Sequence, residues 1–206
     1  MKVKTNINQI IRFDGKNVFF EVMANALPIG KIQINFIEYD ATQEKNNRIK
    51  QNITIYIDQY DALVLANDIL SGKMKALADK AKEEAKAKGL KYAPPIFIDI
   101  GGVSAKVLEK RNEKRADGMS LSRQFKITPG EKMPWILSAE TGPGEENENG
   151  LIVPKYNPAK PEQIVRVPLD DNNFKKFALV IKTMVEYNIK KQLDVALSNV
   201  TLKKTS

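Results

Sequence analysis

The segment Asn52–Leu70 constrains the fold most, because it predicts a strand that passes directly into a helix. Its first part alternates apolar and other side chains, and the apolar positions are Ile53, Ile55 and Ile57. This alternation is typical of a strand with one buried face. Asp58 ends the alternation. Apolar residues then recur at helical spacing, at Ala62, Leu65, Ala66 and Ile69.

The same order of features returns in the second half of the chain. An alternating run there ends at Leu169, Asp170 follows, and helical spacing begins at Phe174. Each aspartate is placed to cap the helix after it, because its carboxylate accepts hydrogen bonds from N–H groups of the first turn. The shared order of strand, aspartate and helix predicts an internal duplication.

The first half is predicted to form an antiparallel meander followed by one helix. An Asp14-Gly15 turn joins the first two strands. A sheet with one solvated face needs a helix on the other face, and residues 60–89 are predicted to supply it. The expected strands are Gln9–Phe13, Asn17–Met23, Lys31–Tyr39 and Arg48–Ile57.

The second half is predicted to repeat this order of strands and helix, with longer connections between the strands. Pro94-Pro95 marks the boundary between halves. Residues 141–150, which are acidic and rich in glycine, are expected to form a hairpin tip, and a closing helix is expected from Asn173 to about Leu197. The expected strands are Ile96–Ile100, Arg123–Ile127, Pro134–Glu140, Leu151–Tyr156 and Gln163–Leu169.

These elements predict an α+β fold of two ββββα units, in which each antiparallel sheet is backed by its C-terminal helix. We expect a single, pseudo-symmetric, duplicated domain with halves 1–92 and 93–200 and a basic tail at 201–206. An OB-fold is the second choice. It is disfavoured by the two strand-to-helix junctions, since an OB barrel predicts only one inserted helix.

The residue inventory excludes several kinds of chemistry. The chain contains no cysteine and no histidine. Disulfides, thiolate catalysis and cysteine-based metal sites are therefore excluded, and the commonest general base is missing. The stretch 141–150 lacks a phosphate-loop pattern, and its acidic residues lack EF-hand spacing. We expect a non-enzymatic protein without cofactor or metal, although composition leaves Ser–Lys or paired-carboxylate catalysis open.

The charge balance favours a polyanionic partner. The formal net charge is +8, and the sequence pI is near 9.4. No apolar run approaches the roughly 18 residues of a membrane span, and the first residues lack a signal-peptide core. We therefore expect a cytoplasmic protein with no membrane partner.

The solvated faces of the predicted strands combine cations, amides and aromatic rings, which suits single-stranded nucleic acid. Each residue also has an ordinary structural alternative: Trp135 after Pro134 can fill the core, and strand lysines can serve solubility alone. The candidate binding residues are Lys31, Gln33, Asn35, Arg48, Lys50, Tyr56, Arg123, Lys126, Trp135, Lys155, Tyr156 and Arg166.

The order of strands to Ile57, a helix from Tyr60, strands to Leu169 and a helix from Asn173 resembles the PC4/Whirly-like family of single-stranded-DNA-binding proteins. The resemblance implies tandem ββββα halves and binding of single-stranded DNA. The Lys-Gly-Lys-Ala-type signature of plant Whirly proteins is absent, so no binding residue is carried over from the family. RNA is not excluded as the partner, since no feature here recognises a 2′-hydroxyl.

A protein of another class is the alternative: an assembly module that forms a homo-oligomer through sheet edges or the long C-terminal apolar stripe. Nucleic-acid binding gains if the strand cations share one concave face with Trp135 or Tyr56, and the assembly module gains if they scatter. The cations that decide this are Arg48, Lys50, Arg123, Lys126 and Arg166.

Overall fold

The first half forms a four-stranded antiparallel sheet in sequence order (sheet A). The computed structural model describes residues 7–204. Alternate residues of the third strand, Ile32, Ile34 and Phe36, are fully buried, as the alternation predicts. The predicted meander is confirmed, with strands β1 (Gln9–Asp14), β2 (Val18–Met23), β3 (Lys31–Tyr39) and β4 (Ile49–Asp58).

Two helices follow sheet A where one was predicted. Helix α1 (Gln59–Leu70) begins at the predicted cap, where the N–H of Tyr60 donates to Oδ1 of Asp58 at 2.9 Å. It ends at Leu70, and Gly72, whose φ of 84° belongs to the left-handed region, directly precedes α2 (Lys73–Ala87). The backbone of Gly72 therefore breaks the predicted helix, because a left-handed residue cannot continue a right-handed turn.

The second half forms sheet B, whose four long strands follow the same antiparallel order, while a short additional strand pairs with the far end of the third long strand. A short helix, α3 (Ala105–Lys110), precedes the second strand. The strands are β5 (Phe97–Val103), β6 (Ser120–Pro129), β7 (Trp135–Glu146), β8 (Ile152–Pro154) and β9 (Gln163–Leu169).

Strand β7 runs through part of the segment predicted to be a hairpin tip. Residues 141–146 pair with β6 or β8, so the tip prediction is wrong for them. Their glycines mark close packing instead of a turn. A Cβ atom on Gly142 would lie 2.8 Å from the ring of Tyr156, and one on Gly144 would lie 2.7 Å from Ile152.

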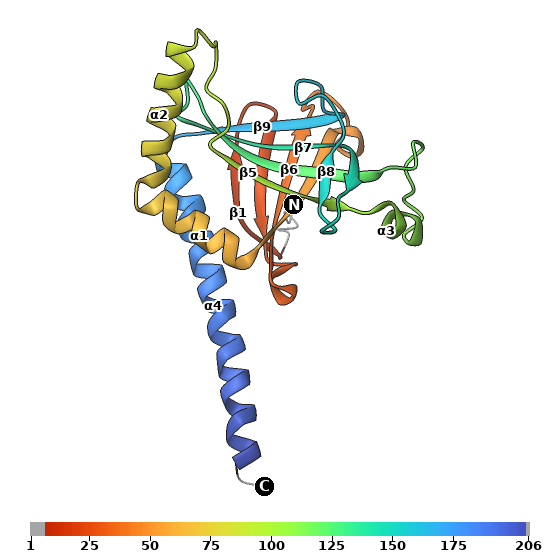
Figure 1. The fold of residues 1–206 in the computed structure, drawn as a ribbon, viewed down its shortest axis with the longest axis vertical. Helices are drawn as coiled ribbons and strands as arrows, with labels where there is room; N and C mark the ends of the chain where they lie inside the picture. The colour runs from red at the N-terminus through yellow and green to blue at the C-terminus, as the bar shows by residue number, and fades with distance from the viewer. Residues whose placement is uncertain (1–6, 205–206) are drawn as a thin grey trace.

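Helix α4 (Asp171–Lys204) closes the chain and projects well beyond the sheets (Figure 1). The N–H of Asn173 donates to Oδ1 of Asp170 at 2.6 Å, as the predicted cap requires. The helix continues past the expected end near Leu197 into the predicted basic tail. Residues 205 and 206 of that tail lie outside the described residues.

One hydrophobic core joins both sheets with α1 and α4. The strands of the two sheets cross at a steep angle (Figure 1). Where they face each other, the rings of Phe36 and Phe125 lie 6.0 Å apart, and Phe177 of α4 lies 5.5 Å from Phe20. The protein is thus α+β with two antiparallel sheets, as predicted. In the described part of the chain, no helix is both long and apolar enough to span a membrane.

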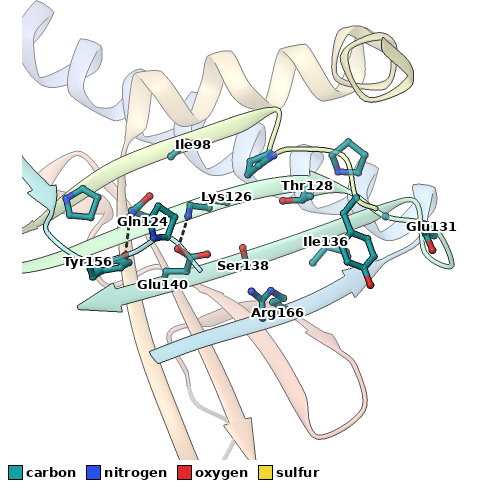
Figure 2. Close-up of a pocket in the computed structure, with 16 residues that line it drawn as sticks. Ile98, Gln124, Lys126, Thr128, Glu131, Ile136, Ser138, Glu140, Tyr156 and Arg166 are labelled. Atoms are coloured by element: carbon teal, nitrogen blue, oxygen red, sulfur yellow. Dashed lines mark hydrogen bonds and ion pairs between the residues drawn. The ribbon is translucent and has the colours of Figure 1, made fainter. Parts of the chain in front are cut away.

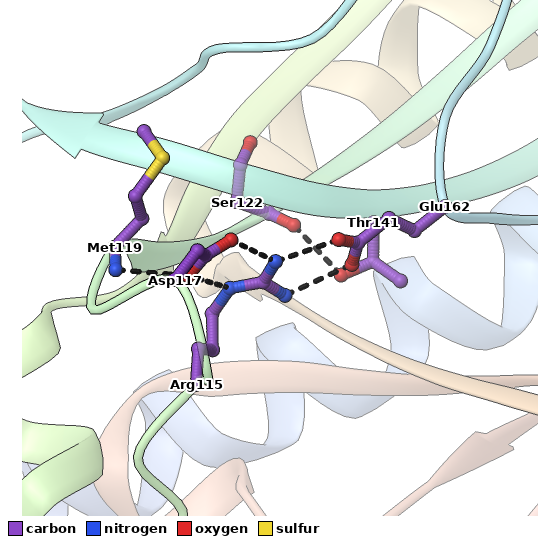
Figure 3. A network of polar contacts seen from close by, with 6 residues as sticks. All are labelled: Arg115, Asp117, Met119, Ser122, Thr141 and Glu162. Carbon is purple, nitrogen blue, oxygen red and sulfur yellow. Dashed lines mark hydrogen bonds and ion pairs between the residues drawn. The ribbon is translucent and has the colours of Figure 1, made fainter.

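A polar network fastens the loop before β6 to the segment before β9 (Figure 3). The guanidinium of Arg115 donates to both carboxylate oxygens of Glu162, at 2.9 and 2.6 Å, and to both of Asp117, at 3.1 and 2.6 Å. These hydrogen bonds lower the pKa of both carboxyl groups. Nearby, the Thr141 hydroxyl donates to the carbonyl of Ser122 at 2.8 Å.

Replacing Arg115 with glutamine is expected to lower the melting temperature near neutral pH and to have less effect in acid. A carboxyl group whose pKa is depressed on folding stabilises the protein above its unfolded pKa, about 4. That stability is lost as the pH falls through the folded pKa. Melting curves of the wild type and R115Q between about pH 7 and pH 3 test this. K114Q, which removes an exposed pair with Glu109, is the control. A difference in melting temperature that stays constant with pH would refute the role of the network.

Candidate nucleic-acid interface

The outer face of sheet B contains a hollow of about 660 Å³, here called the trough (Figure 2). Its floor is one row of register partners across four strands: Ile98, Lys126, Ser138 and Arg166. Because side chains alternate along a strand, this row faces away from Phe125, Leu137 and the rest of the core. The trough is lined by Tyr92, Pro95, Ile98, Gln124, Lys126, Thr128, Pro129, Gly130, Glu131, Ile136, Ser138, Glu140, Pro154, Tyr156, Pro158 and Arg166.

Two tyrosines belong to different ends of the trough. Tyr156 follows β8, and its hydroxyl accepts a hydrogen bond from Nε2 of Gln124 at 2.9 Å (Figure 2). Burial raises the pKa of Tyr156, so its hydroxyl stays protonated at neutral pH. Tyr92 comes from the linker before β5 and lies near the β6–β7 turn, and it is 63% exposed. Both rings are therefore placed to contact a flat ligand.

The floor of the trough carries a buried ion pair. Lys126 and Glu140 are 8% and 5% exposed, and Nζ of Lys126 donates to Oε2 of Glu140. Arg166 lies beside them and is exposed, and within the described residues it forms no ion pair. The lining also contains Glu131, an exposed carboxylate without a salt bridge among the described residues, so the charged side chains of the trough balance one another.

A second hollow, of about 490 Å³, adjoins the trough and shares Tyr92, Gly130 and Glu131 with it. It adds three cations from α2 and the linker: Lys82, Lys86 and Lys91. Nζ of Lys91 lies 5.2 Å from the ring centroid of Tyr92, within cation–π range. No salt bridge to any of these lysines occurs among residues 7–204. None of these four residues is among those predicted from the sequence, although Tyr92 stands beside Lys91 and close to Pro94 and Pro95.

Three other predicted residues meet where the edges of the two sheets come together. Lys31, Tyr56 and Arg123 line a hollow of about 650 Å³ that also contains Asp58 and Asp99. Lys31 pairs with Asp58 at 3.3 Å, and burial lowers the pKa of Arg123. Burial, followed by the charge of Asp61, raises the pKa of Asp99. Carboxylates offset the cations in this hollow, as Glu131 and Glu140 do in the trough.

The remaining polar candidates lie outside these hollows. Gln33 and Asn35 lie on the outer face of sheet A, where Nε2 of Gln33 donates to Oδ1 of Asn35 at 3.0 Å. Lys50 pairs with Asp40 at 3.2 Å, and Lys155 pairs with Glu145 at 2.6 Å. Nε of Arg48 donates to the carbonyl of Gln43 at 2.9 Å.

The structure contradicts the placement of Trp135 on a binding face. The indole is 4% exposed, and it stacks on Phe174 with ring centroids 4.2 Å apart. Its Nε1 donates to Oδ1 of Asp171 at 2.7 Å. Trp135 therefore belongs to the core, because it occupies the inward-facing position of β7 next to outward-facing Ile136.

The five strand cations do not share one face, and by the criterion set out above their scatter favours the assembly module. Lys126 and Arg166 lie in the trough, Arg123 lies with Tyr56, and Arg48 and Lys50 line neither hollow. The trough and the adjoining second hollow bring Tyr156 and Tyr92 together with cations that form no salt bridge among the described residues: Arg166, Lys82, Lys86 and Lys91. Comparisons with protein-family models, curated proteins and solved structures find no match to this chain.

Proposed function

We propose that this protein binds single-stranded nucleic acid, primarily DNA, along the trough. The observation that carries the proposal is that Tyr156, Arg166 and Tyr92 line one hollow and that the adjoining hollow, which shares Tyr92, adds Lys82, Lys86 and Lys91. Unpaired bases stack on aromatic rings, each stack being worth roughly 1–3 kcal/mol, while cations follow the phosphates. A protein that binds in this way would act in the cytoplasm, protecting or delivering single strands in replication, recombination or transfer.

The element order supports a finer assignment of the two halves as PC4/Whirly-like units. Strands β1–β4 precede α1, and strands β5, β6, β7 and β9 precede α4. An OB-like curled barrel is the competing description. Superposition of the two halves tests the assignment: residues 9–70 should superpose on the core strands of sheet B and the start of α4 by a rotation of about half a turn.

Replacing Arg166 with glutamine is expected to weaken binding of oligo-dT and to flatten its salt dependence. For single strands, each phosphate neutralised contributes about −0.7 to the slope of log K against log salt. Loss of one contact should reduce the slope by about that amount. The matched control is R48Q, because Arg48 is an exposed arginine that lines neither the trough nor the second hollow. Equal slopes for R166Q and the wild type would show that Arg166 does not contact a phosphate of the bound oligonucleotide.

A second candidate is the assembly module, and the projecting half of α4 favours it. Leu193 and Val195 are 55% and 58% exposed on this part of the helix. Exposed apolar side chains beyond the body of a protein often mark a contact with another chain. Sedimentation velocity of the wild type and L193E separates the candidates: an oligomer that the substitution dissociates supports assembly, and a monomer at all concentrations argues against it.

A further inference from the structure

The buried pair of Lys126 and Glu140 calls for an explanation beyond stability. Their neighbours in the trough are mostly apolar, including Ile98, Ile136 and Pro154. A buried ion pair costs several kcal/mol of desolvation per ion, and apolar residues of similar volume often replace such a pair without loss of stability. Both residues line the hollow, so a ligand there would meet the small exposed part of each side chain, 11% for Lys126 and 6% for Glu140.

Each member of the pair keeps unused hydrogen-bonding capacity. Nζ of Lys126 has three N–H donors and directs one of them to Oε2 of Glu140. No described residue donates to Oε1 of Glu140. The floor therefore offers a carboxylate edge that accepts two hydrogen bonds directly beside an ammonium group that donates.

We infer that the trough holds one guanine base, a proposal that rests on the binding function proposed above. Glu140 accepts from N1–H and the N2 amino group of the base, and Lys126 donates to O6. Among the four bases only guanine presents two adjacent donors next to an acceptor. Thymine presents one N–H between two carbonyls, and adenine and cytosine present one amino group beside ring acceptors.

The size and walls of the trough fit this ligand. Its volume of about 660 Å³ lies in the range of small-molecule sites, roughly 300–1,000 Å³. Tyr156 and Arg166 line the same hollow, so a base held there would have an aromatic ring and a guanidinium group within the same site. The same chemistry would also accept a free guanine nucleotide, and the test separates the two sources.

The test compares oligo-dT strands that differ only in one central base: guanine, adenine, cytosine or thymine. The guanine strand should bind about 10-fold more tightly, as expected for one well-formed bidentate contact. Inosine at that position lacks the N2 amino group and should remove most of the gain. The control base is 7-deazaguanine, which keeps the N1, N2 and O6 groups and should retain it. These substitutions are made in the ligand, so the fold of the protein is not disturbed.

Each other outcome has a definite meaning. Equal affinity for all four strands would overturn the guanine inference and leave the binding function standing. Failure of every strand to bind at low salt would overturn the binding function as well. If guanosine 5′-monophosphate bound as tightly as the guanine strand, the ligand of the trough would be a free nucleotide and not a base within a nucleic-acid strand.

Discussion

Replacing Phe177 with alanine is expected to lower the free energy of unfolding by about 3–5 kcal/mol, and both sheets should be destabilised together. The ring is fully buried at the centre of the core. It lies 6.3 Å from the ring of Phe13, 5.5 Å from that of Phe20 and 6.4 Å from that of Phe125. Its removal therefore leaves a cavity that both sheets share.

Urea unfolding followed by two probes measures the effect of F177A. Trp135 fluorescence reports on sheet B and α4, and far-UV circular dichroism reports on the whole chain. The control is L179A on the same helix, since Leu179 is 52% exposed and its truncation should change stability by less than about 0.5 kcal/mol. Separate transitions for the two probes, or a loss below about 1 kcal/mol, would contradict the shared core.

Replacing Glu140 with leucine is expected to cost about 3–5 kcal/mol, because Lys126 would remain buried without its partner. The double variant K126M/E140L should recover most of that loss, since two apolar side chains of similar volume need no desolvation. Urea unfolding of the two single variants and the double variant measures the coupling. If K126M/E140L were as unstable as E140L, the loss would arise from packing and not from the unpaired charge.

The double variant also separates stability from function. K126M/E140L keeps Tyr92, Tyr156 and Arg166, so it should still bind oligo-dT. It should no longer distinguish guanine from inosine. A folded double variant that kept the guanine preference would show that the ion pair does not contact the base.

The strands of sheet A could be predicted from the sequence because each one alternates and turn residues separate them. Strand β7 was cut short because Gly142, Pro143 and Gly144 are turn-forming residues. They continue the strand because they pair with β6 and β8, and close neighbours leave no room for a Cβ atom at Gly142 or Gly144. That reason depends on contacts between strands distant in the sequence.

The trough was only partly predictable. The alternation of β6 and β9 placed Lys126 and Arg166 on a solvated face, but their shared row depends on strand register. The pairing of Lys126 with Glu140 depends on the same register, which single-sequence patterns do not specify. The residue type of Trp135 does not show which face of β7 it occupies, because an indole can fill a core or lie on a binding face.

The central claim is binding of single strands along the trough, and fluorescence anisotropy tests it most directly. Labelled oligo-dT, a duplex of equal length and single-stranded RNA are titrated with the wild type and with Y92A/Y156A at two salt concentrations. The account predicts salt-sensitive binding of oligo-dT that exceeds duplex binding, a loss of about 10-fold or more in the double variant, and unchanged emission from buried Trp135. No binding of any nucleic acid at low salt, or equal binding by the wild type and Y92A/Y156A, would contradict it.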